Sequence, residues 1–216
     1  MNNQERIKSA QQFMENIHQH DFSGHDIAHV YRVTSLAEYI AEHENVEQPL
    51  VITLAALLHD TIDDKLVDSN IQLQSLTQFL QTLDLSLEMQ QHILHIIQHM
   101  SYNNGQNNHV TLSIEGQIVR DADRLDAIGA IGIARTFQFA GHFNEPMWTE
   151  QLSDAEMSHQ DINHLPPSAI KHFYEKLFKL KDLMHTTTAR HIAQERHQFM
   201  TSFVKQFLTE WNYSKD

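Results

Sequence analysis

The chain carries 17 histidines among its 216 residues and no cysteine. Histidine is the commonest metal ligand in proteins and the side chain whose ordinary pKa lies closest to neutral pH. The absence of cysteine excludes disulfides, thiolate zinc sites, iron–sulfur clusters and cysteine nucleophiles. The residue types therefore point to metal binding or proton transfer by histidines acting together with carboxylates.

Three His-Asp dipeptides occur in the chain, namely His20-Asp21, His25-Asp26 and His59-Asp60. Chance supplies about one in a chain of this composition, so the dipeptide alone is a weak signal. The third differs because it ends the apolar run 50–58, which predicts a buried helix with a proline in its first turn. A carboxylate buried beside an imidazole is costly unless a cation or an ion pair compensates it. A divalent metal ion would do so, since Asp oxygens and His nitrogens suit such cations.

Two further residues can complete such a site. His29 shares a helical stripe with Val33 and Leu36, at the edge of a core-facing surface. Asp123 precedes the small-residue run 127–132, and we expect close helix packing there to bring Asp123 near the end of helix 50–59. The alternative for these residues is a structural cluster of buried polar groups.

The sequence lacks the motifs of several other enzyme classes. It contains no P-loop, no dinucleotide glycine fingerprint and no nucleophile elbow. His95 and His99 have the spacing of a zincin helix, but Ile96 stands where its catalytic glutamate belongs. The net charge of −13 argues against a nucleic-acid polymer or a membrane surface as partner.

The elements that must position these residues are helical almost throughout. Apolar residues recur every three or four positions, and only 109–114 could be read as a strand. We expect an all-α, single-domain helical bundle over residues 1–216, with loops at 101–108 and 141–167, the second one mobile. No signal peptide or spanning segment is visible, so we expect a cytoplasmic protein. The expected helices are 50–59, 71–83, 87–100, 114–139 with a break near Asp121, 169–184 and 189–211.

The order His29, His59-Asp60, Asp123 resembles the HD superfamily of metal-dependent phosphohydrolases. The flanking segments 24–33, 55–60, 121–135 and 172–211 are similar to one subgroup of small bacterial HD hydrolases. The resemblance implies an all-α HD-domain fold in which His29, His59, Asp60 and Asp123 bind one divalent cation. Manganese or magnesium is the first choice, and iron, nickel, cobalt or zinc would also suit.

The same resemblance implies roles for residues after the dipeptide. An acidic pair follows at this distance in related guanosine tetraphosphate hydrolases, so Asp63 is the first choice for a general base and Asp64 the second. A nearby carboxylate can orient and deprotonate water that a metal has acidified. Family members often have Glu where this chain has Asp63.

A phosphorylated substrate also needs local positive charge on this acidic protein. Arg32 follows His29 by three residues and so lies on the ligand face, and Lys65 follows the acidic pair. Both could instead be ordinary surface charges. Further candidates for substrate contact are His25, His99 and Arg124, although pairing with the surplus acids is the alternative for Arg124.

The function implied is hydrolysis of a small phosphorylated metabolite, in a monomer or a homodimer. By resemblance to the subgroup, the substrate is a nucleoside triphosphate cleaved to monophosphate and pyrophosphate. The alternatives are a nucleotide monophosphatase, a cyclic-diester phosphodiesterase, or a regulatory metal-binding protein without turnover.

Overall fold

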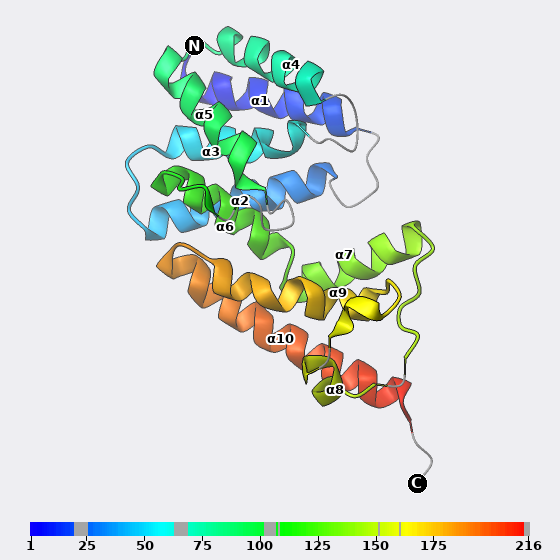
Figure 1. Cartoon of the computed structure of the whole chain (residues 1–216). Helices are drawn as coiled ribbons and strands as arrows, with labels where there is room; N and C mark the ends of the chain where they lie inside the picture. The colour runs from blue at the N-terminus through cyan, green and yellow to red at the C-terminus, as the bar shows by residue number, and fades with distance from the viewer. Residues whose placement is uncertain are drawn as a thin grey trace. The chain divides into compact units, whose positions relative to one another are not determined.

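The structure is a computed structural model that describes residues 1–19, 26–62, 69–101, 107, 109–150, 152–159 and 161–213. Helices dominate these residues, none of them forms a strand, and the expected all-α fold is confirmed (Figure 1). None of the described helices combines the length and apolar composition needed to cross a bilayer. The α-helices are α1 (Asn3–His18), α2 (Ile27–His43), α3 (Pro49–Leu58), α4 (Ser69–Thr82), α5 (Leu87–Met100), α6 (Ile114–Asp126), α7 (Gly129–His142), α8 (Asp154–His159), α9 (Ala169–Glu175) and α10 (Thr187–Trp211). The 3-10 segments are η1 (His59–Thr61), η3 (Ile162–His164) and η4 (Leu177–Leu183).

The chain forms two compact units, Met1–Asp123 and Arg124–Asp216. Helix α6 crosses the division, because its last residues belong to the second unit. The expectation of one domain over residues 1–216 stays a prediction, and so does the mobility of 141–167.

Helix α3 is the centre of the first unit. Pro49 opens it, and every residue from Val51 to Leu58 is buried. A helix that is apolar on all sides must be covered on all sides, and α3 packs against α1, α2 and α5 (Figure 1). The continuous apolar run therefore places the end of α3, where His59 follows, inside the unit.

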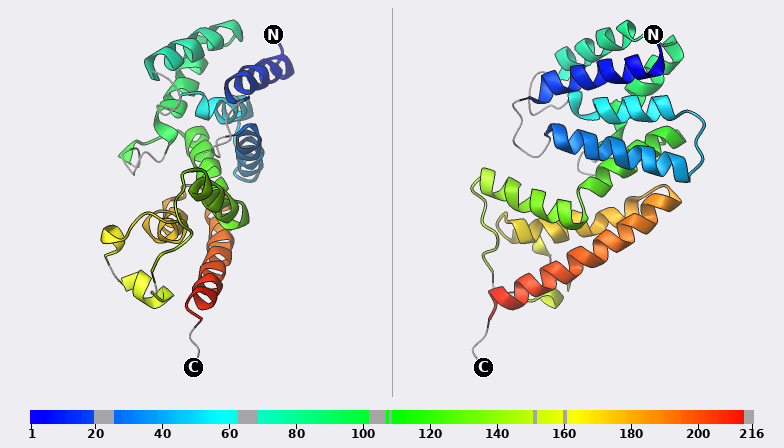
Figure 2. Two further views of the ribbon diagram at one scale, coloured as in Figure 1. Left: turned by 90° about the vertical axis from the view of Figure 1, so that its right-hand side faces the viewer. Right: turned by 180° about the vertical axis from the view of Figure 1, so that it is seen from behind.

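In the second unit the long helix α10 packs against α7, α8 and η4 (Figure 2). Aromatic rings fill this contact. Phe137 of α7 lies 5.9 Å from both Phe203 and Phe207 of α10, measured between ring centroids. Phe173 of α9 adds a ring 6.2 Å from Phe203.

The break expected near Asp121 is wrong. Helix α6 continues through Asp121 to Asp126, and the interruption comes just before Gly129. Asp121 is fully buried and shares a helical face with Ile118 and Leu125, so it lies within the helix and does not end it.

The expected helix 169–184 is also interrupted. It is divided into α9 and η4 at Lys176, whose backbone angles are φ −134° and ψ −60°. Neither glycine nor proline marks this position in the sequence. The expected loop 141–167, in turn, contains α8 and η3.

Two features require glycine at position 129, the left-handed backbone conformation and the close approach of the Arg196 side chain. The φ of Gly129 is +81°, and a Cβ there would lie 2.9 Å from Cγ of Arg196. We expect Gly129→Ala to lower the free energy of unfolding by about 1–2 kcal/mol, the cost of a left-handed backbone for an L-residue. Urea unfolding measures it.

Gly141 provides the matched control in the same helix. A Cβ there would meet nothing within 4 Å, and Gly141→Ala should raise the free energy of unfolding by about 0.5–1 kcal/mol. Equal free energies of unfolding for the two variants would contradict the requirement for glycine at position 129.

Candidate metal centre

His29 enters the site from the first turn of α2. Asp26 caps this helix, and its Oδ1 accepts a hydrogen bond from the backbone N–H of His29 at 2.7 Å. The cap fixes where the helix begins and hence where the His29 ring points. The His29 ring is fully buried. The second His-Asp dipeptide of the sequence therefore supplies a helix cap through its Asp26.

His59 enters where α3 gives way to η1. Its Nδ1 lies 2.8 Å from the carbonyl oxygen of Ala56. Since a carbonyl only accepts, Nδ1 carries a hydrogen and donates it, which leaves Nε2 for the site. Thr61 fastens the same turn, because its hydroxyl donates to the carbonyl of Leu58 at 2.7 Å.

Four side chains converge at this point. The Nε2 atoms of His29 and His59 lie 3.2 Å apart. Each oxygen of the Asp60 carboxylate faces one ring, Oδ2 at 3.2 Å from His29 Nε2 and Oδ1 at 3.3 Å from His59 Nε2. Asp123, near the end of α6, places Oδ1 at 3.6 Å and 3.9 Å from the same two nitrogens. Both rings are buried and both carboxylates are partly exposed, so the cluster is open on its carboxylate side.

The donor set fits a divalent cation. Two Nε2 lone pairs at 3.2 Å repel each other unless a proton or a cation lies between them. Ligand bonds of about 2.0–2.2 Å place neighbouring ligand atoms roughly 3.0–3.5 Å apart. The distances of 3.2–3.9 Å are close to that range. Within the described part of the chain, His29, His59 and Asp123 form the one group of three or more side chains spaced to hold a metal.

The electrostatics favour positive charge at the same point. Burial lowers the pKa of His59, but attraction to Asp60, a hydrogen bond with it, and attraction to Asp123 outweigh burial and raise that pKa to about 9. The same negative field attracts a cation to the nitrogens, where it competes with the proton.

The remaining predicted residues divide into three groups. Arg32 lies on α2 one turn after His29 and is half-buried. His99 is half-buried near the end of α5, and Arg124 is buried, with a guanidinium that donates to the carbonyl of Leu183. Their roles in substrate binding stay predictions. His25, Asp63, Asp64 and Lys65 lie outside the described residues.

Arg120 was missed by the sequence reasoning. Arg120 is 1% exposed, and its guanidinium donates to three carbonyl oxygens, one near the end of α5 and two between α5 and α6. It thereby fixes the end of α5 against the helix that carries Asp123. Arginine among the apolar residues of α6 is a signal of such buried bonding. The three acceptors are His99 at 2.8 Å, Asn107 at 3.1 Å and Val110 at 3.3 Å.

The segment that contains the four converging side chains also matches a known protein family. The family model described as HD domain matches residues 26–128, which include all four converging side chains. The Bacillus subtilis protein YpgQ is 42% identical over 205 residues, covering 93% of this chain and 92% of YpgQ.

Two crystal structures are similar to this chain in both fold and sequence. The crystal structure of YpgQ in complex with ADP has a TM-score of 0.77 and 37% identity in the structural alignment, with 97% of each chain covered. A crystal structure of an HD-superfamily hydrolase from Bacillus thuringiensis has a TM-score of 0.76 and 38% identity, covering 99% of this chain and 100% of that one. With two buried imidazoles and two carboxylates meeting in the matched region, the chain belongs to the HD-domain superfamily of hydrolases.

Proposed function

We propose that this protein is a divalent-metal-dependent phosphohydrolase that cleaves a nucleoside triphosphate to the monophosphate and pyrophosphate. The observation that carries the proposal is the meeting of the His29 and His59 nitrogens with the Asp60 and Asp123 carboxylates. The ADP bound to YpgQ, a relative over almost its whole length, supports a nucleotide as the ligand.

The four converging side chains would hold the cation. Two imidazole nitrogens and two carboxylate groups form a mixed donor set, which suits manganese or magnesium first and also iron, nickel, cobalt or zinc. When bound, such a cation polarises a phosphate oxygen and lowers the pKa of water.

The other residues would act on the proton and on the phosphates. Asp63 accepts the proton of the attacking water, with Asp64 as the second choice, and both follow Asp60 closely in the chain. Arg32 and Lys65 bind phosphate oxygens, because a guanidinium can make paired hydrogen bonds and an ammonium acts as a compact charge. Further substrate contacts are assigned to His25, His99 and Arg124.

The reaction has a definite atom balance. A new bond forms between the water oxygen and the α-phosphorus, and the bond from that phosphorus to the bridging oxygen of pyrophosphate breaks. Pyrophosphate leaves with its charge stabilised by Lys65, and the monophosphate keeps the new oxygen.

Hydrolysis in oxygen-18 water tests which bond breaks. We expect the label in the nucleoside monophosphate and unlabelled pyrophosphate, when mass spectrometry follows the products of the four triphosphates and their deoxy forms. Label in orthophosphate would show stepwise removal from the γ end, and label in pyrophosphate would show attack on the β-phosphorus. Either result contradicts the proposed reaction and leaves the metal site standing.

The rival activities give other outcomes in the same assay. Turnover of monophosphates or cyclic diesters alone would favour a monophosphatase or a phosphodiesterase. A metal-loaded protein that turns over none of these substrates would be a regulatory metal-binding protein.

A further inference from the structure

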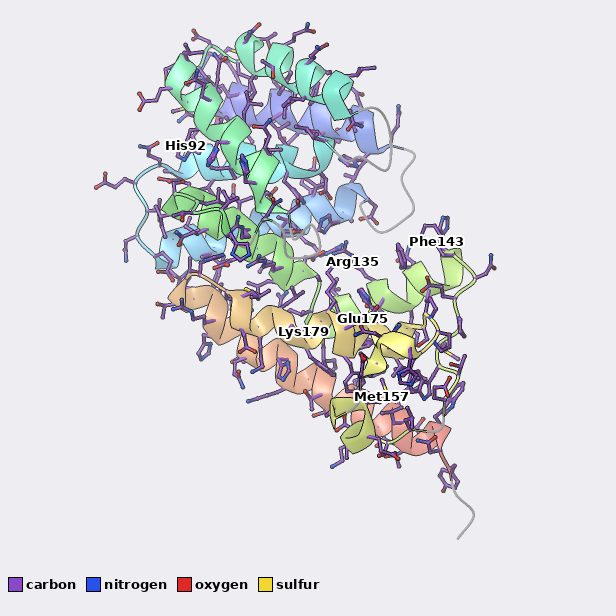
Figure 3. The ribbon with its side chains drawn as sticks, viewed as in Figure 1. His92, Arg135, Phe143, Met157, Glu175 and Lys179 are labelled. Atoms are coloured by element: carbon purple, nitrogen blue, oxygen red, sulfur yellow. The ribbon has the colours of Figure 1, made fainter. Side chains whose placement is uncertain are left out.

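Helix α5 carries a second group of imidazoles, separate from the four converging side chains. His92, His95 and His99 follow one another along one side of it, and Figure 3 labels the first of them. The His95 and His99 rings are in contact, with centroids 4.5 Å apart and planes inclined by 43°. The His95 ring is exposed and the His99 ring half-buried, so the pair is open to solvent.

The hydrogen bonds of His99 leave one nitrogen available. Its Nδ1 lies 2.8 Å from the carbonyl oxygen of His95 and must donate to it, so Nε2 keeps its lone pair. The backbone of His99 is also held, because its carbonyl accepts a hydrogen bond from the buried Arg120 at 2.8 Å. The last turn of α5 is thereby fixed, and less ordering is required when a ligand binds.

His95 is suited to bind as a neutral ligand. Burial lowers its pKa, and the neighbouring charges of His99 and His92 lower it further. A metal ion binds the unprotonated ring, so a lowered pKa favours binding near neutral pH. His92 is not counted as a ligand, because its Nε2 forms a hydrogen bond with the Ser113 hydroxyl at 2.8 Å.

We propose that His95 and His99 form a second metal site, which takes a borderline transition-metal cation such as Ni²⁺, Cu²⁺ or Zn²⁺. Residues four apart on a helix are neighbours, so both imidazoles can bind one ion from the same face. Both protein ligands are nitrogen atoms, a set that suits these cations and disfavours Mg²⁺, which prefers oxygen. Neither ligand belongs to the four converging side chains, and only His99 is also a candidate substrate contact. The Ni²⁺ stoichiometry therefore tests this site without reference to the hydrolysis reaction.

Calorimetric titration of the chelator-treated full chain with NiCl₂ tests this site. We expect His95→Gln and His99→Gln each to take up one equivalent of Ni²⁺ fewer than the wild type at low micromolar concentration. Loss of one of two linked ligands should weaken binding roughly a hundredfold. Titration with MgCl₂ should show no difference among these proteins.

His43 gives the matched control. Its Nδ1 makes the same bond one turn back along its helix, 2.8 Å from the carbonyl of Tyr39, and its ring is also exposed. The residue four positions earlier is a tyrosine, so the ring has no imidazole partner there. His43→Gln should keep the wild-type number of Ni²⁺ ions, and circular dichroism should show the same helix content in all the variants.

Two results would overturn the site. One is an equal Ni²⁺ stoichiometry in the wild type and His95→Gln. The other is a loss in His43→Gln as large as the loss in His95→Gln, since it would mean that any exposed histidine of this chain binds the ion.

Discussion

Asp60→Ala should abolish tight binding of a divalent cation and, with it, hydrolysis of every nucleotide. The Asp60 carboxylate faces both imidazoles, at 3.2 Å and 3.3 Å, so its removal takes away a ligand and the nearest negative charge. We expect the manganese content of the manganese-loaded protein after dialysis, measured by mass spectrometry, to fall from about one ion per chain to near zero. Turnover should fall below detection, because the chemistry depends on that ion.

A surface carboxylate serves as the control for this change. Asp182 has a side chain that is 72% exposed and lies in the other compact unit, so Asp182→Ala should keep both metal and activity. Full occupancy in Asp60→Ala would refute the proposed coordination, whatever the activity.

Asp63→Asn should separate metal binding from catalysis. The amide cannot accept the proton of water, so we expect kcat to fall about 10²–10⁴-fold, the usual contribution of a general base. Metal content and thermal stability should stay at wild-type values, because Asp63 is not among the proposed ligands. Steady-state kinetics with the best triphosphate, at saturating metal, measures the effect.

The neighbouring carboxylate distinguishes a specific base from general negative charge. Asp64→Asn removes the same charge one residue later and should change kcat much less. Wild-type turnover in Asp63→Asn would show that Asp63 is not the general base. A larger loss of kcat in Asp64→Asn than in Asp63→Asn would assign that role to Asp64.

The local sequence was sufficient to predict the buried helix at the centre of the first unit. The apolar run after Pro49 predicted a buried helix, and the structure buries Val51 to Leu58 and places His59 at its end. Burial makes the His59-Asp60 dipeptide informative, because polar groups inside a core must be paired. The proximity of His29 and Asp123, expected from helix faces and motif order, is also found.

The reason expected for the position of Asp123 stays a prediction. The small residues after it were expected to let helices approach near His59. The close approach seen at Gly129 is to the Arg196 side chain, within the second unit. The sequence spacing showed that something packs closely there and could not show what.

Some features of the second unit depend on tertiary contacts. Asp126 is buried, and Arg135 Nη1 lies 2.7 Å from its carboxylate, an ion pair between side chains nine residues apart. Figure 3 labels Arg135 on α7. Pattern reading takes such charges as exposed, since it does not see the partner.

One miss was avoidable from the sequence. Ser153 and Glu156 form a capping box at the start of α8, with the Ser153 N–H donating to Glu156 Oε2 at 2.8 Å and the Glu156 N–H donating to Ser153 Oγ at 3.3 Å. The spacing Ser-x-x-Glu is the known signature of a helix start. It stood inside a segment interpreted as a loop.

The arrangement of the four converging side chains also bears on how the chain keeps its fold. They come from three elements far apart in sequence, and the two imidazoles alone are 30 positions apart. An unfolded chain cannot hold them together, so a bound ion acts as a reversible crosslink that exists only in the native state. At an ion concentration 1,000 times its Kd, this adds about 4 kcal/mol to the free energy of unfolding. Cellular metal supply would then govern the lifetime of the protein as well as its rate of turnover.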